Sequence, residues 1–486
     1  MISFENLLLI ISILIVLSIL IIKVSENFGL PALLLFLGVG MLAGSDGIGG
    51  IYFEDVKITQ SVGMLALIFI LFSGGLDTNI KNVFPVRMEA FSLATLGVMA
   101  TTFFTGLFCY YVLGFELIYG LLIGAIISST DAAAVFSILR TNKIGLKNNL
   151  KPLLEFESGC NDPMAIFLTM TITGIIVSNE FNAVSVSLDL VRQFAFGGIL
   201  GYAAAKGLVK LFNKINLSNE ALYPVLLLSS AVLIYSFTVF IGGSGYLAVY
   251  VAGIIIGNSN IIQKKSLLRF FDGLAWLGQI GMFLTLGLLV NPSELLLILG
   301  TGILLSFFLI LVGRPLSVFI SLMFSKYKFN EKVAVSWIGL RGAVPVILAT
   351  IPLSAGLDDS HNIFNIVFFV VLSSVLIQGW TIKYIADFFK VTEKSDTVSI
   401  SPIQFETSKN LDSELIDFIV PFNSPISGQT IIELGLPKDC LIIFICRDEI
   451  FFVPEGNTFI AEGDILQILV SKNEMKNLIN KLSHVS

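Results

Sequence analysis

Thirteen stretches of apolar residues, most of them long enough to cross a bilayer as a helix, follow one another along this 486-residue chain. Apolar residues make up 55% of the chain, charged residues only 13%, and the mean hydropathy is +0.90. These values exclude a soluble globular protein and are typical of a polytopic helical membrane protein. The expected spans are residues 4–22, 30–45, 60–76, 88–113, 117–139, 151–178, 190–212, 221–241, 246–258, 267–289, 293–324, 332–354 and 362–388.

The first span, residues 4–22, lacks a basic leader and a small-residue cleavage site, so we interpret it as a membrane helix and not as a signal peptide. Basic residues then collect in alternate loops, those that follow the odd-numbered spans. They are Lys23, Lys81, Arg87, Arg140, Lys143, Lys147, Lys151, Lys206, Lys210, Lys214, Lys264, Lys265, Arg269, Lys326, Lys328, Lys332, Lys383 and Lys390. The other loops hold only Lys57 and Arg192. The positive-inside rule therefore predicts an outside N-terminus and a cytoplasmic C-terminus.

Two aspartates lie inside apolar spans, Asp131 in the fifth and Asp162 in the sixth. A charge in the bilayer interior is costly, and it persists where it faces a cavity, a partner or an ion path. The fifth span is interrupted at Ser128–Asp131 and the twelfth at Gly339–Pro345. Broken helices in matching halves predict an inverted-repeat transporter with its site at the midplane. The alternative is that these small residues serve helix packing only.

The residues around these aspartates suit a monovalent cation and a proton. Pro163 frees a backbone carbonyl one turn earlier, which adds an oxygen to those of Asp162, Asp131, Thr130 and Ser158. Burial favours the neutral form of a carboxyl group, so the same carboxylate can bind a proton near neutral pH. One carboxylate that holds either ion is enough for exchange. The alternative for Asp162 is a hydrogen-bonded structural residue.

Glu157 needs a basic partner if it is buried. We expect it to pair with Arg341, the basic residue in the twelfth break, as a structural ion pair between the two halves. Arg314, beside Pro315, is the other deep arginine, and we expect its side chain to reach toward the interface.

Three motifs in this order, STDAAAVFSIL, FESGCNDPMAIFL and WIGLRGAVPVILA, resemble the ion-site motifs of NhaP-type cation/proton antiporters, and the second is most similar to their potassium/proton branch. The resemblance covers residues 1–390. It implies a homodimer in the cell membrane, with a scaffold panel and a moving core in which the fifth and twelfth spans cross.

The same resemblance assigns roles to individual residues. It implies that Asp162 binds the cation and the proton, and that Ser158, Glu157 and Thr130 lie close to the ion. It implies that Asp131 shapes the crossing. Electrogenic relatives carry a second aspartate at the position of Asn161, so this chain is expected to exchange one cation for one proton.

The pattern changes after residue 390. Residues 391–403 are a polar linker, and residues 404–486 alternate β-rich runs with short helical segments, which predicts a small cytoplasmic α+β domain. Strands are expected at 415–420, 440–446, 450–454 and 465–470, and helices at 429–434 and 474–482.

This second domain resembles the TrkA C-terminal domain, through P-x-x-G, L-x-L-P, an Arg-Asp turn and Glu-Gly-Asp. The resemblance implies a dimerising regulatory module, with a nucleotide or cyclic dinucleotide as its candidate ligand. A dimer clamp without a ligand is the alternative, because no phosphate loop is visible.

The leading hypothesis is thus an electroneutral antiporter that exchanges K⁺, or Na⁺, for H⁺. A ligand-gated cation channel would need a carbonyl selectivity filter, which is not found, and a non-transporting ion sensor would not need carboxylates in two spans. No catalytic triad, metal cluster or nucleotide fingerprint indicates an enzyme or a resident cofactor. Residues 391–486 carry 7 basic against 14 acidic residues, which argues against nucleic acid as a partner.

Overall fold

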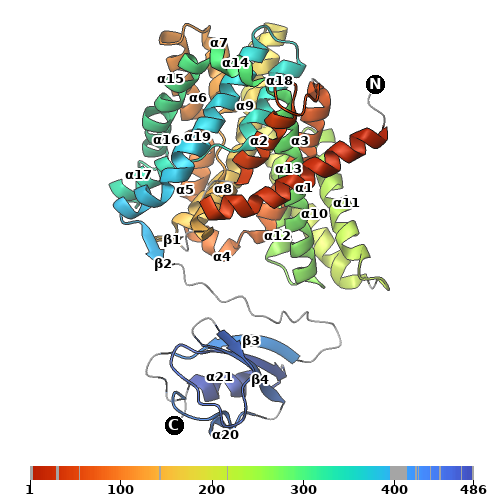
Figure 1. Cartoon of the computed structure of the whole chain (residues 1–486), viewed down its shortest axis with the longest axis vertical. Coiled ribbons are helices and arrows are strands. Elements are labelled where there is room, and N and C mark those ends of the chain that lie inside the picture. The colour runs from red at the N-terminus through yellow and green to blue at the C-terminus, as the bar shows by residue number, and fades with distance from the viewer. Residues whose placement is uncertain are drawn as a thin grey trace. The chain divides into compact units, whose positions relative to one another are not determined.

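The computed structural model describes residues 4–28, 32–53, 55–141, 144–215, 217–394, 413–421, 424, 426–437, 439–447, 450–471 and 473–483. The chain divides into two compact units, a helical membrane unit that makes up nearly all of residues 1–395 and a tail unit that consists mainly of residues 396–486 (Figure 1). Of the linker expected at 391–403, residues 395–403 lie outside the described residues.

The membrane unit consists of helices joined by short loops. The uninterrupted helices are α1 (Phe4–Phe28), α2 (Ala32–Ala43), α3 (Val56–Asp77), α9 (Leu150–Ser178), α10 (Ala183–Lys214), α11 (Leu222–Phe240), α12 (Gly245–Gly257), α13 (Lys264–Leu289) and α19 (Ser360–Phe388). Two further spans consist of helical pieces that follow one another through a turn or a short segment of 3₁₀ or π helix, α4–α5–α6 (Ile80–Val83, Arg87–Ser92, Val98–Tyr111) and α14–α15–α16 (Pro292–Leu297, Leu299–Phe308, Arg314–Ser321). The interrupted ones are α7–α8 (Leu117–Ile126, Ala132–Thr141) and α17–α18 (Phe329–Ile338, Ala343–Ser354).

Several helices begin at a side-chain cap that the sequence supplies. Asp55 accepts a hydrogen bond from the Ile58 N–H at the start of α3. Asn182 accepts from the N–H groups of Val184 and Ser185 at the start of α10. Such caps satisfy N–H groups that have no partner within the helix.

In the described part of the chain, eight helices are long and apolar enough to cross a membrane, and the bent pair α17–α18 makes a ninth. Four shorter apolar helices add to these, so thirteen helical segments lie on the thirteen expected ranges. The prediction of a polytopic helical membrane fold is confirmed, and the structure shows why some spans are hard to recognise by length alone. The fifth is split into two short helices and the ninth has only 13 residues.

A small two-stranded sheet in the membrane unit was not predicted. The strand β1 (Ile144–Leu146), directly after α8, pairs antiparallel with β2 (Thr392–Lys394), directly after α19. The Lys147 N–H also donates to the Val391 carbonyl at 2.9 Å. The loop after α8 is therefore tied to the segment that leads into the tail.

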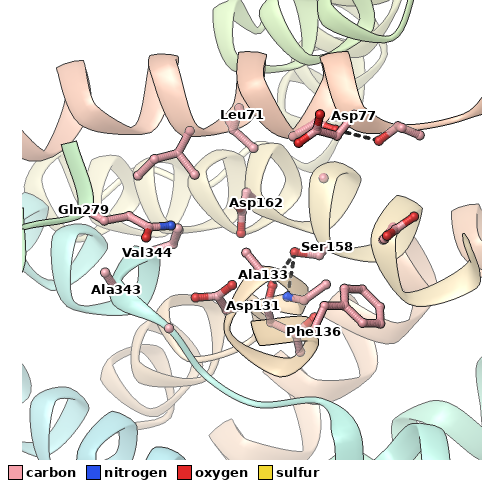
Figure 2. Close-up of a pocket in the computed structure, with 18 of the residues that line it drawn as sticks. Leu71, Asp77, Asp131, Ala133, Phe136, Ser158, Asp162, Gln279, Ala343 and Val344 are labelled. Carbon is pink, nitrogen blue, oxygen red and sulfur yellow. Dashed lines mark hydrogen bonds between the residues drawn. The ribbon is translucent and has the colours of Figure 1, made fainter. Parts of the chain in front are cut away.

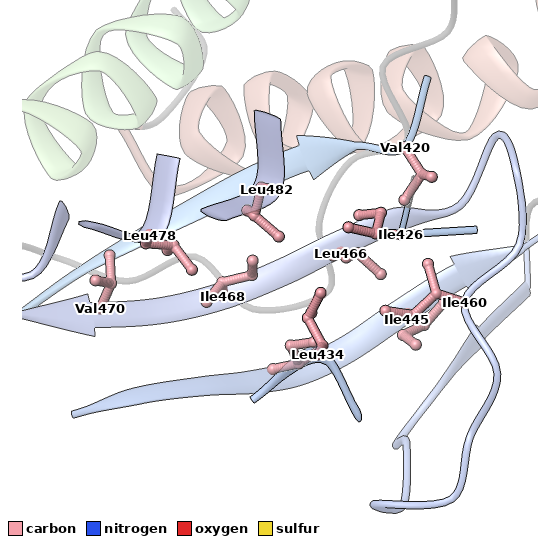
Figure 3. Close-up of a cluster of buried hydrophobic side chains, with 11 residues drawn as sticks. Val420, Ile426, Leu434, Ile445, Ile460, Leu466, Ile468, Val470, Leu478 and Leu482 are labelled. Carbon is pink, nitrogen blue, oxygen red and sulfur yellow. The ribbon is translucent and has the colours of Figure 1, made fainter. Parts of the chain in front are cut away.

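The tail unit is an α+β domain, as predicted. Its sheet has the order β3–β6–β4–β5 and is accompanied by two helices. The elements are β3 (Ser413–Ile419), α20 (Ile431–Leu434), β4 (Cys440–Arg447), β5 (Ile450–Phe452), β6 (Ile465–Ser471) and α21 (Met475–Ser483). Leu478 and Leu482 of α21 are buried against β6 residues such as Ile468, so this domain has a hydrophobic core of its own (Figure 3).

Candidate ion-binding site

The interrupted helices α7–α8 and α17–α18 cross at their breaks. The Asp131 N–H donates to the Leu340 carbonyl at 2.7 Å, so each break satisfies a backbone group that the other leaves free. Gly342 lies so close that a Cβ added there would be 2.2 Å from Asp131 Oδ2. The predicted crossing of two broken helices is confirmed.

Charged side chains complement the helix ends at this crossing. Asp131 Oδ1 accepts a hydrogen bond from the Ala134 N–H at the start of α8, where the helix dipole is positive. Arg341 Nη1 donates to the carbonyls of Ser128 and Ser129, both at 2.8 Å, just after α7, where the dipole is negative. Arg341 is 1% exposed, so this arrangement is fully enclosed by protein.

A cavity of about 620 Å³ opens beside the crossing, lined by residues of α3, α8, α9, α12, α13, α18 and β1. Asp131, Ser158 and Asp162 converge on this space (Figure 2). Asp77 of α3, Glu155 of α9 and Asp272 of α13 add further carboxylates to its wall. A cavity with several oxygen atoms in its wall suits a hard monovalent cation, which prefers oxygen ligands.

Asp162 lies in the middle of α9, one residue before Pro163, and is 5% exposed. Its Oδ1 accepts a hydrogen bond of 2.5 Å from the Ser129 hydroxyl. Pro163 has no N–H, so the Gly159 carbonyl one turn earlier loses its helical partner. Ser129 is a site residue that sequence reasoning missed, although it belongs to the break that reasoning had identified.

Hydrogen bonds between α9 and the break in α7–α8 involve the predicted site residues Thr130, Ser158 and Asn161. The Ser158 hydroxyl donates to the Thr130 carbonyl at 2.9 Å and accepts from the Ala132 N–H at 3.2 Å. Asn161 Nδ2 donates to the Thr130 hydroxyl at 2.6 Å. Thr130, Asp131, Ser158 and Asp162 line the cavity. Asn161 and Glu157 are both 1% exposed and are buried outside that lining.

The expected pair of Glu157 with Arg341 is wrong. Glu157 Oε1 pairs with Arg314 Nη2 of α16 at 2.6 Å, and both side chains are buried. Arg341 instead donates hydrogen bonds to the Ser128 and Ser129 carbonyls, just after α7. Arg314 does not reach toward the interface, because it packs against the second break, where a Cβ on Gly339 would lie 2.5 Å from Arg314 Nε.

Comparison with known proteins agrees with this geometry. The family profile described as sodium/hydrogen exchanger, transmembrane, matches residues 13–387, and the TrkA-C domain profile matches residues 415–483. The chain belongs to the sodium/hydrogen exchanger family. As a member of this family of cation/proton antiporters, it is an integral membrane protein with a TrkA-C domain.

Relatives within this exchanger family cover nearly the whole chain. The K(+)/H(+) antiporter NhaP2 of Shewanella sp. strain MR-4 is 40% identical over 469 residues, 96% of this chain and 81% of that protein. The K(+)/H(+) antiporter NhaP of Alkalimonas amylolytica is 38% identical over 98% of this chain and 83% of its own length. The solved structure of the sodium proton antiporter MjNhaP1 from Methanocaldococcus jannaschii superposes with a TM-score of 0.68, at 27% identity over 76% of this chain and 97% of that chain.

Proposed function

We propose that this antiporter exchanges cytoplasmic K⁺ for H⁺, one for one, at the carboxylate of Asp162. The observation that supports it is the cavity at the crossing, where Asp162 meets the Ser129 hydroxyl and faces Asp131 and Ser158. The names of the 40% and 38% identical relatives favour K⁺, although the oxygen ligands would also suit Na⁺.

Exchange follows from competition for one carboxylate. A cation or a proton neutralises Asp162, and only a neutralised site moves readily through a low-dielectric interior. The cavity wall includes β1, which lies within the basic loop predicted to be cytoplasmic, so we infer that the site in this conformation faces the cytoplasm. Reorientation of the core helices then exposes the site to the other side.

The stoichiometry rests on Asn161. Its amide donates to Thr130, and an amide does not titrate, so it adds no second exchangeable charge. Asp131 caps α8 through its hydrogen bond with the Ala134 N–H, which gives it a structural role in this conformation. One cation for one proton moves no net charge.

The test is proton flux in proteoliposomes of purified protein, driven by outward K⁺ or Na⁺ gradients and repeated at opposite clamped membrane potentials. We expect cation-dependent proton uptake, stronger with K⁺, with an equilibrium that is independent of voltage. Cation conductance without proton movement would favour a ligand-gated channel, and the absence of either flux would favour an ion sensor. A voltage-dependent equilibrium would contradict the one-for-one stoichiometry.

We also propose that the tail is a dimeric regulatory domain. In this domain Asp464 of the Glu-Gly-Asp motif is 0% exposed and accepts two hydrogen bonds from Arg447, at 2.8 and 2.7 Å. Those motif residues therefore stabilise the fold. A nucleotide or cyclic dinucleotide remains the candidate ligand, tested by calorimetric titration of the full-length protein with ATP and with a cyclic dinucleotide. Light scattering of the purified protein tests the dimer.

A further inference from the structure

The second break, between α17 and α18, is held from behind by two buried polar side chains of α19. Gln378 Nε2 donates to the Trp337 carbonyl at 2.8 Å, near the end of α17. The Ser374 hydroxyl donates to Gln378 Oε1 at 2.5 Å and accepts from the Arg341 N–H at 3.0 Å. Ser374 and Gln378 are 1% and 2% exposed.

These contacts form one end of a series of hydrogen-bonded residues that continues to the first break. The Arg341 backbone rests on Ser374, and its guanidinium donates to the carbonyls of Ser128 and Ser129 in the first break. The Ser129 hydroxyl in turn donates to Asp162. Gln378 is thus connected to Asp162 through Ser374, Arg341 and Ser129, and all of these residues are buried.

We propose that Ser374 and Gln378 are positioning residues for the ion site. Neither lines the cavity, so neither touches the ion in this conformation. An unwound segment has backbone groups without helical partners, and its conformation depends on what satisfies them. The two α19 side chains form hydrogen bonds with the Trp337 carbonyl and the Arg341 N–H. They therefore hold the Arg341 backbone, and with it the Arg341 Cα, in position.

The alternative is that the two residues only fasten α17 to α19. The structure offers a matched control for that role, because Trp337 Nε1 donates to the Thr381 hydroxyl at 2.9 Å, one turn beyond Gln378 on the same helix. This bond uses the Trp337 side chain, whereas Gln378 holds the Trp337 carbonyl, so Thr381→Val removes a fastening contact and keeps every hydrogen bond between Gln378 and Asp162.

The inference rests on the proposed exchange at Asp162, and the experiment separates the two. Wild-type protein in proteoliposomes is first tested for exchange, and the absence of exchange would refute the proposed function. The positioning role would then be tested by K⁺ binding. The measurement is the K⁺ concentration that gives half of the maximal rise in melting temperature, compared between wild type and variants. With exchange present, KM and kcat for K⁺ are measured for Gln378→Met, Ser374→Ala, Ser374→Thr and Thr381→Val.

We expect Gln378→Met and Ser374→Ala to raise the KM for K⁺ by about three- to tenfold. This is the change in affinity that corresponds to the net free energy of roughly one buried hydrogen bond. The maximal rate should change less than KM. Ser374→Thr, which retains the hydroxyl, should restore KM, and Thr381→Val should leave it unchanged. In a Ser129→Ala background, Gln378→Met should add little, because the chain is already cut.

Wild-type KM in folded Gln378→Met and Ser374→Ala proteins would overturn the proposal. An equal rise of KM in Thr381→Val would also overturn it, since helix fastening alone would then explain the result. Additive effects of Gln378→Met and Ser129→Ala would show that the two residues do not act through the same chain.

Discussion

Asp162 receives its hydrogen bond from Ser129, a neutral hydroxyl, and no ion pair of Asp162 occurs in the described part of the chain. A buried carboxylate with a basic partner would stay charged without an ion. One without such a partner needs a cation or a proton to offset its charge. This residue therefore differs from Glu157, which forms an ion pair with Arg314.

We predict that Asp162→Asn abolishes exchange and leaves folding intact. Asparagine has nearly the same shape and can still meet the Ser129 hydroxyl, but it can neither release a proton nor offset a cation. Cation-dependent proton flux in proteoliposomes should fall to the level of empty liposomes. Asp189→Asn on the exposed side of α10 is the control and should keep full activity. Substantial flux through Asp162→Asn would show that the exchangeable proton binds elsewhere.

We predict that Glu157→Ala and Arg314→Ala each strongly lower the melting temperature of the purified protein. Each leaves a buried charge without its partner, a loss of about 3–5 kcal/mol. The double variant should lose less than the sum of the two single variants, because it removes both charges. Arg192→Ala, which breaks an exposed pair with Asp189, should have little effect. Strictly additive shifts of Glu157→Ala and Arg314→Ala would mean that the pair contributes nothing as a pair.

At the scale of elements, the crossing of α7–α8 with α17–α18 leaves no space for an additional methyl group. A Cβ on Gly342 would lie 2.2 Å from Asp131 Oδ2 and 2.6 Å from its Cβ. We predict that Gly342→Ala pushes the breaks apart and lowers the exchange rate by at least about tenfold, since small misplacements of reacting groups are costly. Gly174→Ala in α9, where nothing lies within 4 Å of the added atom, is the control. An active Gly342→Ala protein would show that the crossing tolerates displacement.

The elements could be predicted from the sequence because a bilayer imposes a strong pattern. Apolar length located the spans, and Ser128–Asp131 and Gly339–Pro345 located both breaks. The partner of Glu157 could not be predicted, since Arg314 and Arg341 both lie deep in the membrane unit. The choice between them depends on how the helices are rotated and on the Ser128 and Ser129 carbonyls, which accept the hydrogen bonds of Arg341. Hydropathy contains no information about helix rotation or about these hydrogen bonds.

The β1–β2 sheet was missed for a related reason. Each strand has three residues, too few for a periodic pattern, and the two are separated by more than 240 positions in sequence. Ser374 and Gln378 were missed because single polar residues in a long apolar helix look the same whether they face a break or another helix. In each case the deciding fact is a long-range contact.

At the scale of the whole molecule, the β1–β2 sheet joins the cavity wall to the segment that precedes the tail in sequence. β1 lines the cavity and follows α8, whose first turn is capped by Asp131, while β2 leads into the tail. A ligand or dimer contact in the tail can change transport only by favouring one conformation of the membrane unit over another. A displacement of β2, transmitted to β1 through their paired backbones, is one way to favour one conformation.

We predict that two truncated proteins that differ by four residues behave differently. A protein ending at Lys394 keeps β2 and should still exchange cations for protons, with an altered dependence on pH or cation concentration because the tail is gone. A protein ending at Lys390 also loses β2 and the hydrogen bond from the Lys147 N–H to the Val391 carbonyl, so β1 loses its partner strand at the cavity wall. Its exchange rate should fall well below that of the longer protein. The measurement is proton flux in vesicles that contain equal amounts of each folded protein. If the protein ending at Lys394 is folded yet inactive, the tail belongs to the transport machinery; if the two truncated proteins behave alike, β2 does not transmit the influence of the tail.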